Sequence, residues 1–403
     1  MKICGVVAEY NPFHSGHAYH LAQTRHLLGA DTALVCAMSG NFVQRGDLAV
    51  FEKYERAEAA VRCGADLVLE LPLSACLWSA EGFAWGAVSM LAALGCVTHL
   101  SFGAECADLP LLQRAAVLAG QQQEALRNSL SLGLSYAAAV QQTVLSVDPE
   151  AGALLRSPNN TLAIEYLRTL SILSSSIQPV AIERKGGAHD SGAPVDGLPS
   201  ASYLRGLLAT GDILSCRPYV PTAAYAVLLR AVRGGAAPVV CGAVNQAIVA
   251  HLRRLTPQTL IPYCGGQDGF SNRLADAIVK NVSFSAICSA AQTRRYPLAR
   301  VRRALLRAWL DLPQSVPPEA SYVRVLALGP RGRTVLHRMK QTCSLPILVK
   351  PAAARTLPQP LQPALTRDGL ADDLYALAYP APALRTGSAY LRKTPYFHPS
   401  LEP

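Results

Sequence analysis

The chain has 403 residues, half of them hydrophobic, and is long enough to bury a sizeable core in two or three domains. Its 37 Lys and Arg against 27 Asp and Glu give a formal charge of +10, an excess that commonly accompanies a polyanionic partner. Eleven cysteines without a CxxC pair exclude a zinc ribbon and give no disulfide framework, and we expect a cytoplasmic protein without a signal peptide or membrane span.

The first 215 residues alternate short apolar, β-branched runs with helical patterns. Strands are predicted at 3–8, 32–38, 65–71 and 97–103, and helices at 15–29, 53–63, 80–94 and 108–127. This alternation predicts an α/β fold with a parallel sheet and crossover helices on both faces. In such sheets ligands bind beyond the carboxyl ends of the strands, where polar segments such as "NPFHSGH", "SGNFVQRGD" and "FGAE" occur in this sequence.

From about residue 216 the sequence becomes rich in Ala, Leu and Arg, which predicts a mainly α-helical second domain. We therefore divide the chain into residues 1–215 and 216–403. The last 53 residues, 351–403, contain nine prolines and are predicted to form an extended or loop-rich tail.

The segment "NPFHSGH" places His14 and His17 around the expected start of the first helix. Unpaired backbone N–H groups and the helix dipole favour an anion there, and two imidazoles add donors for charge that develops during phosphoryl transfer. Gly16 would let a flat ring such as adenine approach the backbone. The alternatives are a surface pair or an i, i+3 metal pair, and the metal interpretation lacks a carboxylate on the same turn, so no metal site is predicted.

A second motif, "LPSASYLRG" at 198–206, sets Ser200 and Ser202 before a predicted helix that carries Arg205. Hydroxyls, backbone N–H groups and a permanent cation suit the distal phosphates of a triphosphate. Ser200 also fits a simple helix N-cap. The two motifs together are much rarer than either one alone.

This pair of motifs resembles the HxGH nucleotidyltransferase superfamily. Longer blocks, "VVAEYNPFHSGHAYH", "AMSGNFVQRGDLAVFEKYERAEAAVRCGADLVLELP", "SPNNTLAIEYLR", "IERKGGAHD" and "YPLARVRRALL", resemble the bacterial tRNA(Met) cytidine acetate ligase family over residues 1–345. The resemblance implies a Rossmann-like sheet followed by a helical RNA-binding domain. It also implies a ligase that activates acetate with ATP as acetyl-adenylate and acetylates N4 of the wobble cytidine of elongator tRNA(Met), releasing AMP and pyrophosphate. Mg²⁺ is expected to arrive with ATP.

Position by position, the resemblance implies that His14 and His17 stabilise the transferring group and that one of two neighbouring asparagines contacts ATP. Turn, capping and surface roles remain open for the glycine, the asparagines and Arg184. The ATP-binding residues expected on this basis, together with the second motif, are Val7, Ala8, Glu9, Tyr10, Asn11, Pro12, Phe13, His14, Ser15, Gly16, His17, Ala18, Tyr19, His20, Gly103, Asn159 or Asn160, Arg184, Ser200, Ser202 and Arg205. Gln44, Arg45 and Asp47, in the loop after the second strand, are hypothesised to help form the acetate pocket.

Six arginines and no acid lie between Arg294 and Arg307. At 100° per residue, one helix face would carry Arg300, Arg303 and Arg307, and the other would carry apolar side chains. We expect this face, with Arg294 and Arg295, to bind RNA phosphates, and Tyr296 to offer a stacking surface. The alternative is a solvated helix, which would usually contain balancing acids. A further basic group, Arg331, Arg333, Arg338 and Lys340, is expected to extend the same track.

Two other functions fit part of the sequence. A small-molecule adenylyltransferase explains the two nucleotide motifs but gives the arginine helix no role. A non-catalytic RNA-binding protein explains the arginines but not the intact histidines. The sequence leaves the oligomeric state open.

Overall fold

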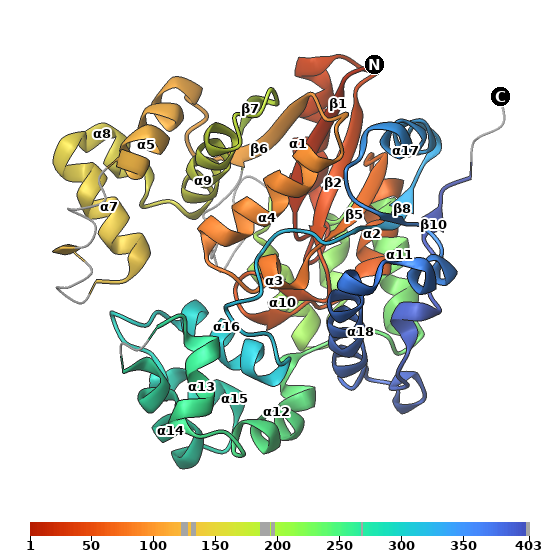
Figure 1. Ribbon diagram of the computed structural model, residues 1–403. Helices are drawn as coiled ribbons and strands as arrows, with labels where there is room; N and C mark the ends of the chain where they lie inside the picture. The colour runs from red at the N-terminus through yellow and green to blue at the C-terminus, as the bar shows by residue number, and fades with distance from the viewer. Residues whose placement is uncertain (122–127, 130–133, 186–193, 195–197, 267–268, 400–403) are drawn as a thin grey trace.

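The computed structural model describes residues 1–121, 128–129, 134–185, 194, 198–266 and 269–399. One mostly parallel sheet organises the chain, in the strand order β10-β8-β5-β2-β1-β6-β7, with β9 pairing with β8 (Figure 1). Only the pairing of β5 with β8 is antiparallel among these described strands. The strands are β1 Ile3–Ala8, β2 Ala33–Ser39, β5 Leu67–Leu71, β6 His99–Ala104, β7 Gln178–Glu183, β8 Val323–Leu328, β9 Ile347–Leu348 and β10 Tyr396–Phe397.

The four strands predicted first in the chain are confirmed as β1, β2, β5 and β6. The helices predicted between them are also confirmed, although the end of the last prediction, residues 122–127, lies outside the described residues. These helices are α1 Ser15–Leu28, α2 Lys53–Arg62, α4 Ala80–Ala93 and α5 Leu109–Gln121.

Helices cover both faces of the sheet, as the alternating pattern predicts, because successive strand side chains point to opposite faces. Ile3, Val35 and Leu69 belong to the core on one face, with helices α4, α5, α9 Pro158–Ile172 and α17 Pro330–Thr342. Cys4, Leu34 and Val68 belong to the core on the other face, with α1, α2, α10 Ala201–Ala209 and α11 Thr222–Arg233. Two helices beyond the first face, α7 Tyr136–Val147 and α8 Pro149–Leu154, pack on α5.

A second group of helices lies below the carboxyl ends of the strands in Figure 1 and shares its own apolar core. Its members are α12 Asn245–Leu252, α13 Pro257–Cys264, α14 Phe270–Lys280, α15 Phe284–Ala291 and α16 Leu298–Trp309. The domain boundary after residue 215 stays a prediction, and β8, β9 and β10 from beyond it join the same sheet as β1. Among the described residues, no helix has both the length and the apolar composition that a bilayer span requires.

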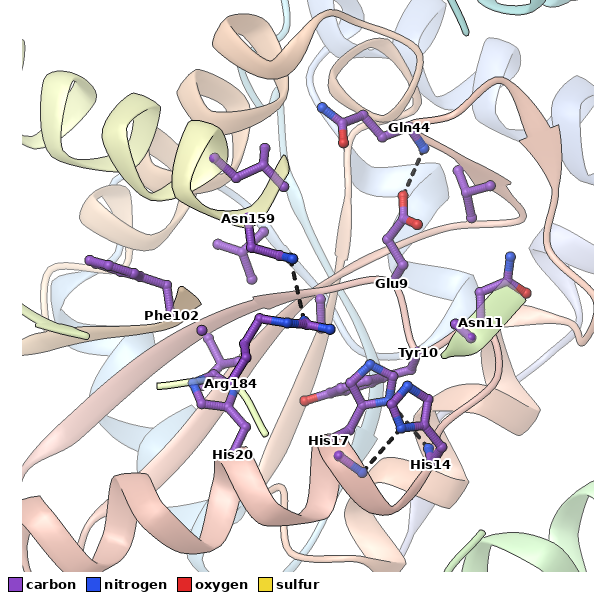
Figure 2. A pocket seen from close by; sticks show the side chains of 18 of the residues that line it. Glu9, Tyr10, Asn11, His14, His17, His20, Gln44, Phe102, Asn159 and Arg184 are labelled. Atoms are coloured by element: carbon purple, nitrogen blue, oxygen red, sulfur yellow. Dashed lines mark hydrogen bonds between the residues drawn. The ribbon is translucent and has the colours of Figure 1, made fainter. Parts of the chain in front are cut away.

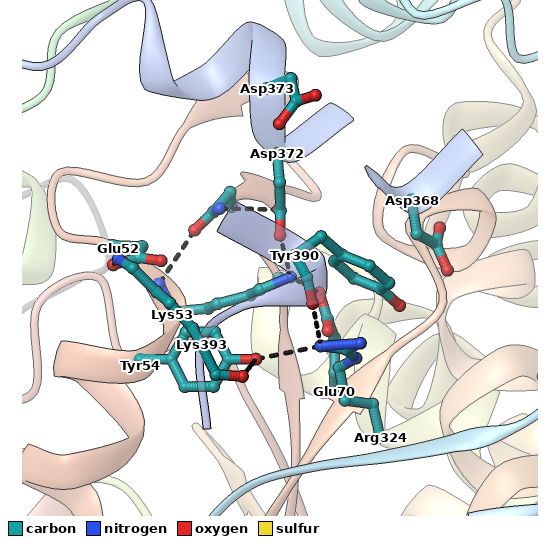
Figure 3. A network of polar contacts seen from close by, with 12 residues as sticks. Glu52, Lys53, Tyr54, Glu70, Arg324, Asp368, Asp372, Asp373, Tyr390 and Lys393 are labelled. Carbon is teal, nitrogen blue, oxygen red and sulfur yellow. Dashed lines mark hydrogen bonds and ion pairs between the residues drawn. The ribbon is translucent and has the colours of Figure 1, made fainter. Parts of the chain in front are cut away.

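The proline-rich tail contains a long helix, so the expectation of a tail without long regular elements is wrong. Helix α18 covers Gln362–Ala376, and Pro363 lies in its first turn, where a missing N–H costs nothing. The helix is held by a buried polar network (Figure 3), in which Lys53 Nζ lies 2.6 Å from Asp372 and 2.7 Å from Glu70. Asn41 Nδ2 also donates to Asp372, at 2.8 Å. The tail is therefore anchored to α2 and β5 by charge.

The remaining elements are short. They are β3 Phe42–Val43, β4 Asp47–Leu48, α3 Leu73–Cys76 and the 3₁₀ turns η1 Leu214–Tyr219, η2 Cys241–Val244, η3 Pro351–Thr356, η4 Gln359–Leu361, η5 Pro382–Leu384 and η6 Ala389–Leu391.

Candidate active site

A pocket of about 400 Å³ opens at the carboxyl ends of β1, β6 and β7. The start of α1, the start of α10 and the loop after β2 complete its walls (Figure 2). Of the residues expected from the sequence, those that line it are Val7, Ala8, Glu9, Tyr10, Asn11, His14, Gly16, His17, Tyr19, His20, Gln44, Arg45, Asp47, Gly103, Asn159, Arg184, Ser202 and Arg205. Pro12, Phe13, Ser15, Ala18, Asn160 and Ser200 are not among its lining residues.

His14 and His17 lie at the first turn of α1, and each uses its Nδ1 to cap the helix. His14 Nδ1 accepts the backbone N–H of Gly16 at 3.1 Å, and His17 Nδ1 accepts the N–H of His14 at 3.2 Å. A neutral imidazole whose Nδ1 is an acceptor carries its proton on Nε2. Both histidines therefore present an Nε2–H donor, which is the group that stabilises charge on a phosphate.

The turn before α1 has an unusual backbone. Tyr10 adopts a φ of +48°, a conformation that is uncommon for a non-glycine residue and is concentrated at functional sites. Its ring is buried against Phe13 and His17, with centroids 4.9 Å from each. Gly16 is needed here for a local reason, because a Cβ at this position would lie 2.9 Å from Cε1 of His14. The packing of Tyr10 thus fixes the direction of the His17 imidazole.

Helix α10 brings the second motif against the first. Ser200 is its N-cap, and its Oγ accepts the N–H of Tyr203 at 3.0 Å. Arg205 Nη1 donates to the carbonyl of Asn11 at 2.9 Å, and Nη2 donates to Ser202 Oγ at the same distance. One guanidinium thereby joins the turn after β1 to the start of α10, although the two segments are separated by about 190 residues in the chain.

The opposite wall of the pocket comes from β6, β7 and α9. Arg184 Nη1 donates to Asn159 Oδ1 at 3.4 Å, while Asn160 is buried and its Oδ1 accepts the backbone N–H of Cys106 at 3.1 Å. Of the two asparagines, Asn159 therefore lines the pocket and Asn160 holds the chain after β6. Burial beneath this wall, with the nearby Arg184 charge, lowers the pKa of His20 to about 4, so His20 is neutral beside Ser101.

The loop between β2 and α2 forms a third wall and is tied to two parts of the protein. Glu9 Oε1 accepts the backbone N–H of Gln44 at 2.7 Å (Figure 2), and Arg303 Nη1 donates to the carbonyl of Gln44 at 3.0 Å. Gly46 has a φ of +75°, and a Cβ there would lie 2.7 Å from the backbone nitrogen of Arg303. Only glycine allows this close approach, so the loop is fixed on α16.

Two arginines at or beside the pocket were not singled out from the sequence. Arg302 of α16 lines the pocket, with Nη1 3.6 Å from Asp47 Oδ2. Arg56 is fully buried and donates to the carbonyls of Phe51 at 2.9 Å and Ser39 at 3.1 Å, and also to those of Glu9 and Gly40. The helical pattern gave no signal for Arg302, because it places this residue off the face of Arg300, Arg303 and Arg307. Burial of Arg56 depends on long-range packing.

The expected arginine face of α16 is only partly exposed. Arg307 is fully buried, and its guanidinium donates to the carbonyls of Ser74 at 3.3 Å and Pro313 at 2.7 Å, so its prediction as an RNA contact is wrong. The segment around α3 covers this end of the helix, which no periodicity reveals. Arg303 is half-buried and bound to Gln44, while Arg294 and Arg295 are exposed.

The ring of Tyr296 is also unavailable for stacking on RNA. Tyr296 is buried and stacks on Phe270 with ring centroids 4.4 Å apart, and the guanidinium of Arg300 lies about 5 Å from both rings.

The other basic group does not continue the same track. Gly332 of α17 packs against the carbonyl of Asp66, which precedes β5 at the amino ends of the parallel strands, opposite the pocket. Arg331, Arg333, Arg338 and Lys340 are exposed there.

Within the part of the chain that the structure describes, no cluster of three or more His, Cys, Asp or Glu side chains is arranged to hold a metal ion.

The fold and the site together define a nucleotidyltransferase of the HIGH class. The sheet is mostly parallel, two imidazoles lie at the end of its first strand, and a helix that starts with Ser-x-x-Arg faces them. The HIGH Nucleotidyl Transferase family model matches residues 1–389. The chain belongs to the tRNA(Met) cytidine acetate ligase family within this class.

Relatives and solved structures agree with this assignment. The tRNA(Met) cytidine acetate ligase of Halothermothrix orenii is 32% identical over 412 residues, covering 96% of this chain and 97% of the relative. That of Alkaliphilus metalliredigens is 31% identical over the full length of both chains. The crystal structure of Thermotoga maritima TmcAL bound with alpha-thio ATP superimposes with a TM-score of 0.91 at 30% identity, covering 98% of this chain and 99% of that one. The apo form of TmcAL gives a TM-score of 0.92.

Proposed function

We propose that this protein is an ATP-dependent tRNA(Met) cytidine acetate ligase of the cytoplasm, which makes N4-acetylcytidine at the wobble position of elongator tRNA(Met). The observation that carries the proposal is the composition of the pocket. The paired histidines, Arg205, the polar loop after β2 and Arg302 of the arginine helix converge on one cavity. A nucleotide site and a basic helix are therefore parts of the same centre.

In the first half-reaction ATP binds with its adenosine toward Gly103, Asn159 and Arg184. Its α-phosphate then lies at the start of α1, where the helix dipole and the Nε2–H groups of His14 and His17 stabilise negative charge. An acetate oxygen attacks the α-phosphorus, the bond to the β-phosphate breaks, and pyrophosphate leaves. Ser202 and Arg205 attract the departing phosphates, and Mg²⁺ enters with ATP as part of the substrate.

Acetate must approach ATP against charge repulsion, so its pocket needs cations. Arg45 and Arg302 both line the wall beside the loop after β2, and Gln44 lies next to them. A guanidinium matches the two oxygens of a carboxylate, which makes these residues the acetate-binding group that the chain offers. In the second half-reaction the cytidine amine attacks the acetyl carbon and AMP leaves, without a covalent enzyme intermediate.

The RNA approaches from the side of α16. Arg294 and Arg295 are exposed just before this helix, and Arg300 and Arg303 lie on it, with Arg303 bonded to the loop that forms one wall of the pocket. Phosphate contacts of this kind position an RNA without reading its sequence. Arg307 is excluded from this set by its burial.

The test is an incubation with ATP, labelled acetate and either elongator tRNA(Met) or no RNA, followed by nucleoside analysis. Acetylated cytidine that forms only with tRNA supports the proposal. Adenylation of a small molecule in the absence of RNA would instead identify a cofactor-forming adenylyltransferase. Tight RNA binding without turnover of ATP would identify a non-catalytic RNA-binding protein.

A further inference from the structure

The transfer step needs a group that takes a proton from the cytidine amine. The exocyclic amine of cytosine is a weak nucleophile, and its nitrogen must lose one proton as it forms an amide. Positioned carboxylates and imidazoles are the usual acceptors in such steps. Among the described residues that line the pocket, the carboxylates are Glu9, Asp47 and Glu183, and the imidazoles are His14, His17 and His20.

The imidazoles are unsuited to this role. The Nδ1 atoms of His14 and His17 already accept backbone N–H groups, so their Nε2 atoms are donors toward the phosphate. His20 is committed to Ser101, with Nε2 2.9 Å from Oγ, and burial lowers its pKa to about 4. None of these rings is therefore placed to accept the proton of the cytidine amine.

Two of the three carboxylates are also committed or distant. Glu9 Oε1 accepts the backbone N–H of Gln44 at 2.7 Å, so this carboxylate holds the loop after β2 in place. Glu183 ends β7, two strands away from β1 on the adenosine side of the sheet. The loop that carries Asp47 follows β2, on the other side of β1.

Asp47 lies on the wall of the pocket nearest the RNA helix. Gly46 and the bond from Arg303 to Gln44 fix its loop on α16. Its Oδ1 accepts the N–H of Leu48 at 2.9 Å, whereas its Oδ2 lies 3.6 Å from Arg302 Nη1, a distance beyond a hydrogen bond. Asp47 lines the cavity and its side chain is only partly exposed, with Oδ2 near a cation.

The charged surroundings of Asp47 suit a proton acceptor. The groups that face it are Arg302 of α16, Arg205 of α10, and the thiols of Cys241 in η2 and Cys288 in α15. Burial raises the pKa of Asp47 above its ordinary value, and the two arginines oppose that rise. Its negative charge repels acetate, so within the hypothesised acetate pocket of Gln44, Arg45 and Asp47 the acetate carboxylate is bound by the cation and not by Asp47.

We propose that Asp47 is the general base of the transfer step; this inference rests on the proposed function. As the cytidine N4 attacks the acetyl carbon, the new N–C bond forms and the bond between that carbon and the phosphate oxygen breaks. AMP leaves with the electron pair of the broken bond. The amine proton passes to Oδ2 of Asp47 and from there to solvent.

The experiment separates the two half-reactions in the Asp47→Asn variant, which preserves the shape and the bond to Leu48. We expect acetate-dependent exchange of pyrophosphate into ATP to stay within about threefold of wild type. Transfer from chemically prepared acetyl-adenylate to elongator tRNA(Met), measured in a single turnover, should fall by about 10² or more, the usual contribution of a general base. The wild-type transfer rate should rise with pH as Asp47 ionises, and the variant should lose that limb.

Two comparisons make the result decisive. Hydroxylamine is a strong nucleophile, so its capture of acetyl-adenylate should proceed equally in both proteins. Asp276→Asn makes the same Asp-to-Asn change on the exposed surface of α14, outside the pocket lining, and should leave transfer within about threefold of wild type. The inference is overturned if Asp47→Asn transfers acetyl at the wild-type rate, or if exchange and transfer fall together. A wild-type protein that makes acetyl-adenylate but never acetylates tRNA would overturn the proposed function itself.

Discussion

The imidazole rings of His14 and His17 lie with their centroids 3.8 Å apart, and each ring accepts a backbone N–H through Nδ1. The Nδ1 side of each ring therefore builds the helix start, and the proposed function assigns the Nε2 side to the substrate. Because the two roles belong to different atoms of the same ring, they can be separated by substitution.

His17→Asn keeps an acceptor oxygen near the position of Nδ1 and removes the Nε2 donor. We expect little change in the thermal unfolding midpoint and a loss of about 10²-fold or more in acetate-dependent pyrophosphate exchange, similar to the loss of an oxyanion-hole donor. His17→Gln, which places an amide donor near the position of Nε2, should recover part of the activity. Equal losses in both variants, accompanied by a lower midpoint, would show that the ring is mainly structural.

Arg56 fastens the carboxyl ends of β1 and β2. Replacing it with Met would leave buried carbonyls, including those of Ser39 and Phe51, without a donor. Each such group costs about 1–3 kcal/mol, so we expect a loss of at least about 3 kcal/mol in the free energy of unfolding. Arg62→Met on the same helix removes a partly exposed i, i+4 pair with Glu58 and a cation–π contact with Tyr396, and should cost about 1 kcal/mol for the two contacts together. Similar unfolding midpoints in urea for both variants would contradict this role.

The arginines around α16 differ in what they do. Arg307→Ala should lower stability because its buried guanidinium binds backbone carbonyls, but it should leave the salt dependence of tRNA binding unchanged. The double variant of Arg294 and Arg295 to Ala should lose less stability than Arg307→Ala, since both side chains are exposed, and should weaken tRNA binding. Each lost phosphate contact should also reduce the slope of log K against log salt by about 0.7–0.9. The reverse pattern, with Arg307 controlling the slope, would place that residue at the RNA.

The sequence predicted the elements whose pattern is local. Strand alternation and the HxGH turn depend on neighbouring residues, so β1, β2, β5 and β6 and the position of the site at their carboxyl ends follow from them. Arg302 and Arg307 show the limit. A helical wheel groups arginines by angle, but it contains no information on α3, which covers Arg307, or on the loop of Asp47, which Arg302 approaches. The nine prolines led to the wrong prediction of a tail without long regular elements for a related reason. Pro363 lies in the first turn of α18, where proline is tolerated, and does not interrupt the helix.

Glu55 of α2 gives stability a dependence on pH. Burial, with the neighbouring Glu52, raises its pKa from 4.5 to about 8. Between these two values the folded chain holds a proton that the unfolded chain has released. This group therefore makes the free energy of unfolding fall as pH rises, by at most about 1.4 kcal/mol per pH unit. The protonated, uncharged form is the one that fits the fold.

Glu55→Gln mimics that uncharged form at every pH. We expect the variant to unfold at nearly the wild-type urea concentration at pH 5 and at a higher concentration than wild type at pH 8.5, since only the wild-type protein must then hold a buried charge beside Glu52. Glu150→Gln is a suitable comparison because Glu150 is 72% exposed, so removing its charge relieves no burial. Its midpoint should follow the wild-type curve at both pH values. If the Glu55→Gln midpoint also runs parallel to wild type from pH 5 to 8.5, the Glu55 carboxyl does not hold a proton in the folded chain, and the pH dependence must arise from the buried acids around α18.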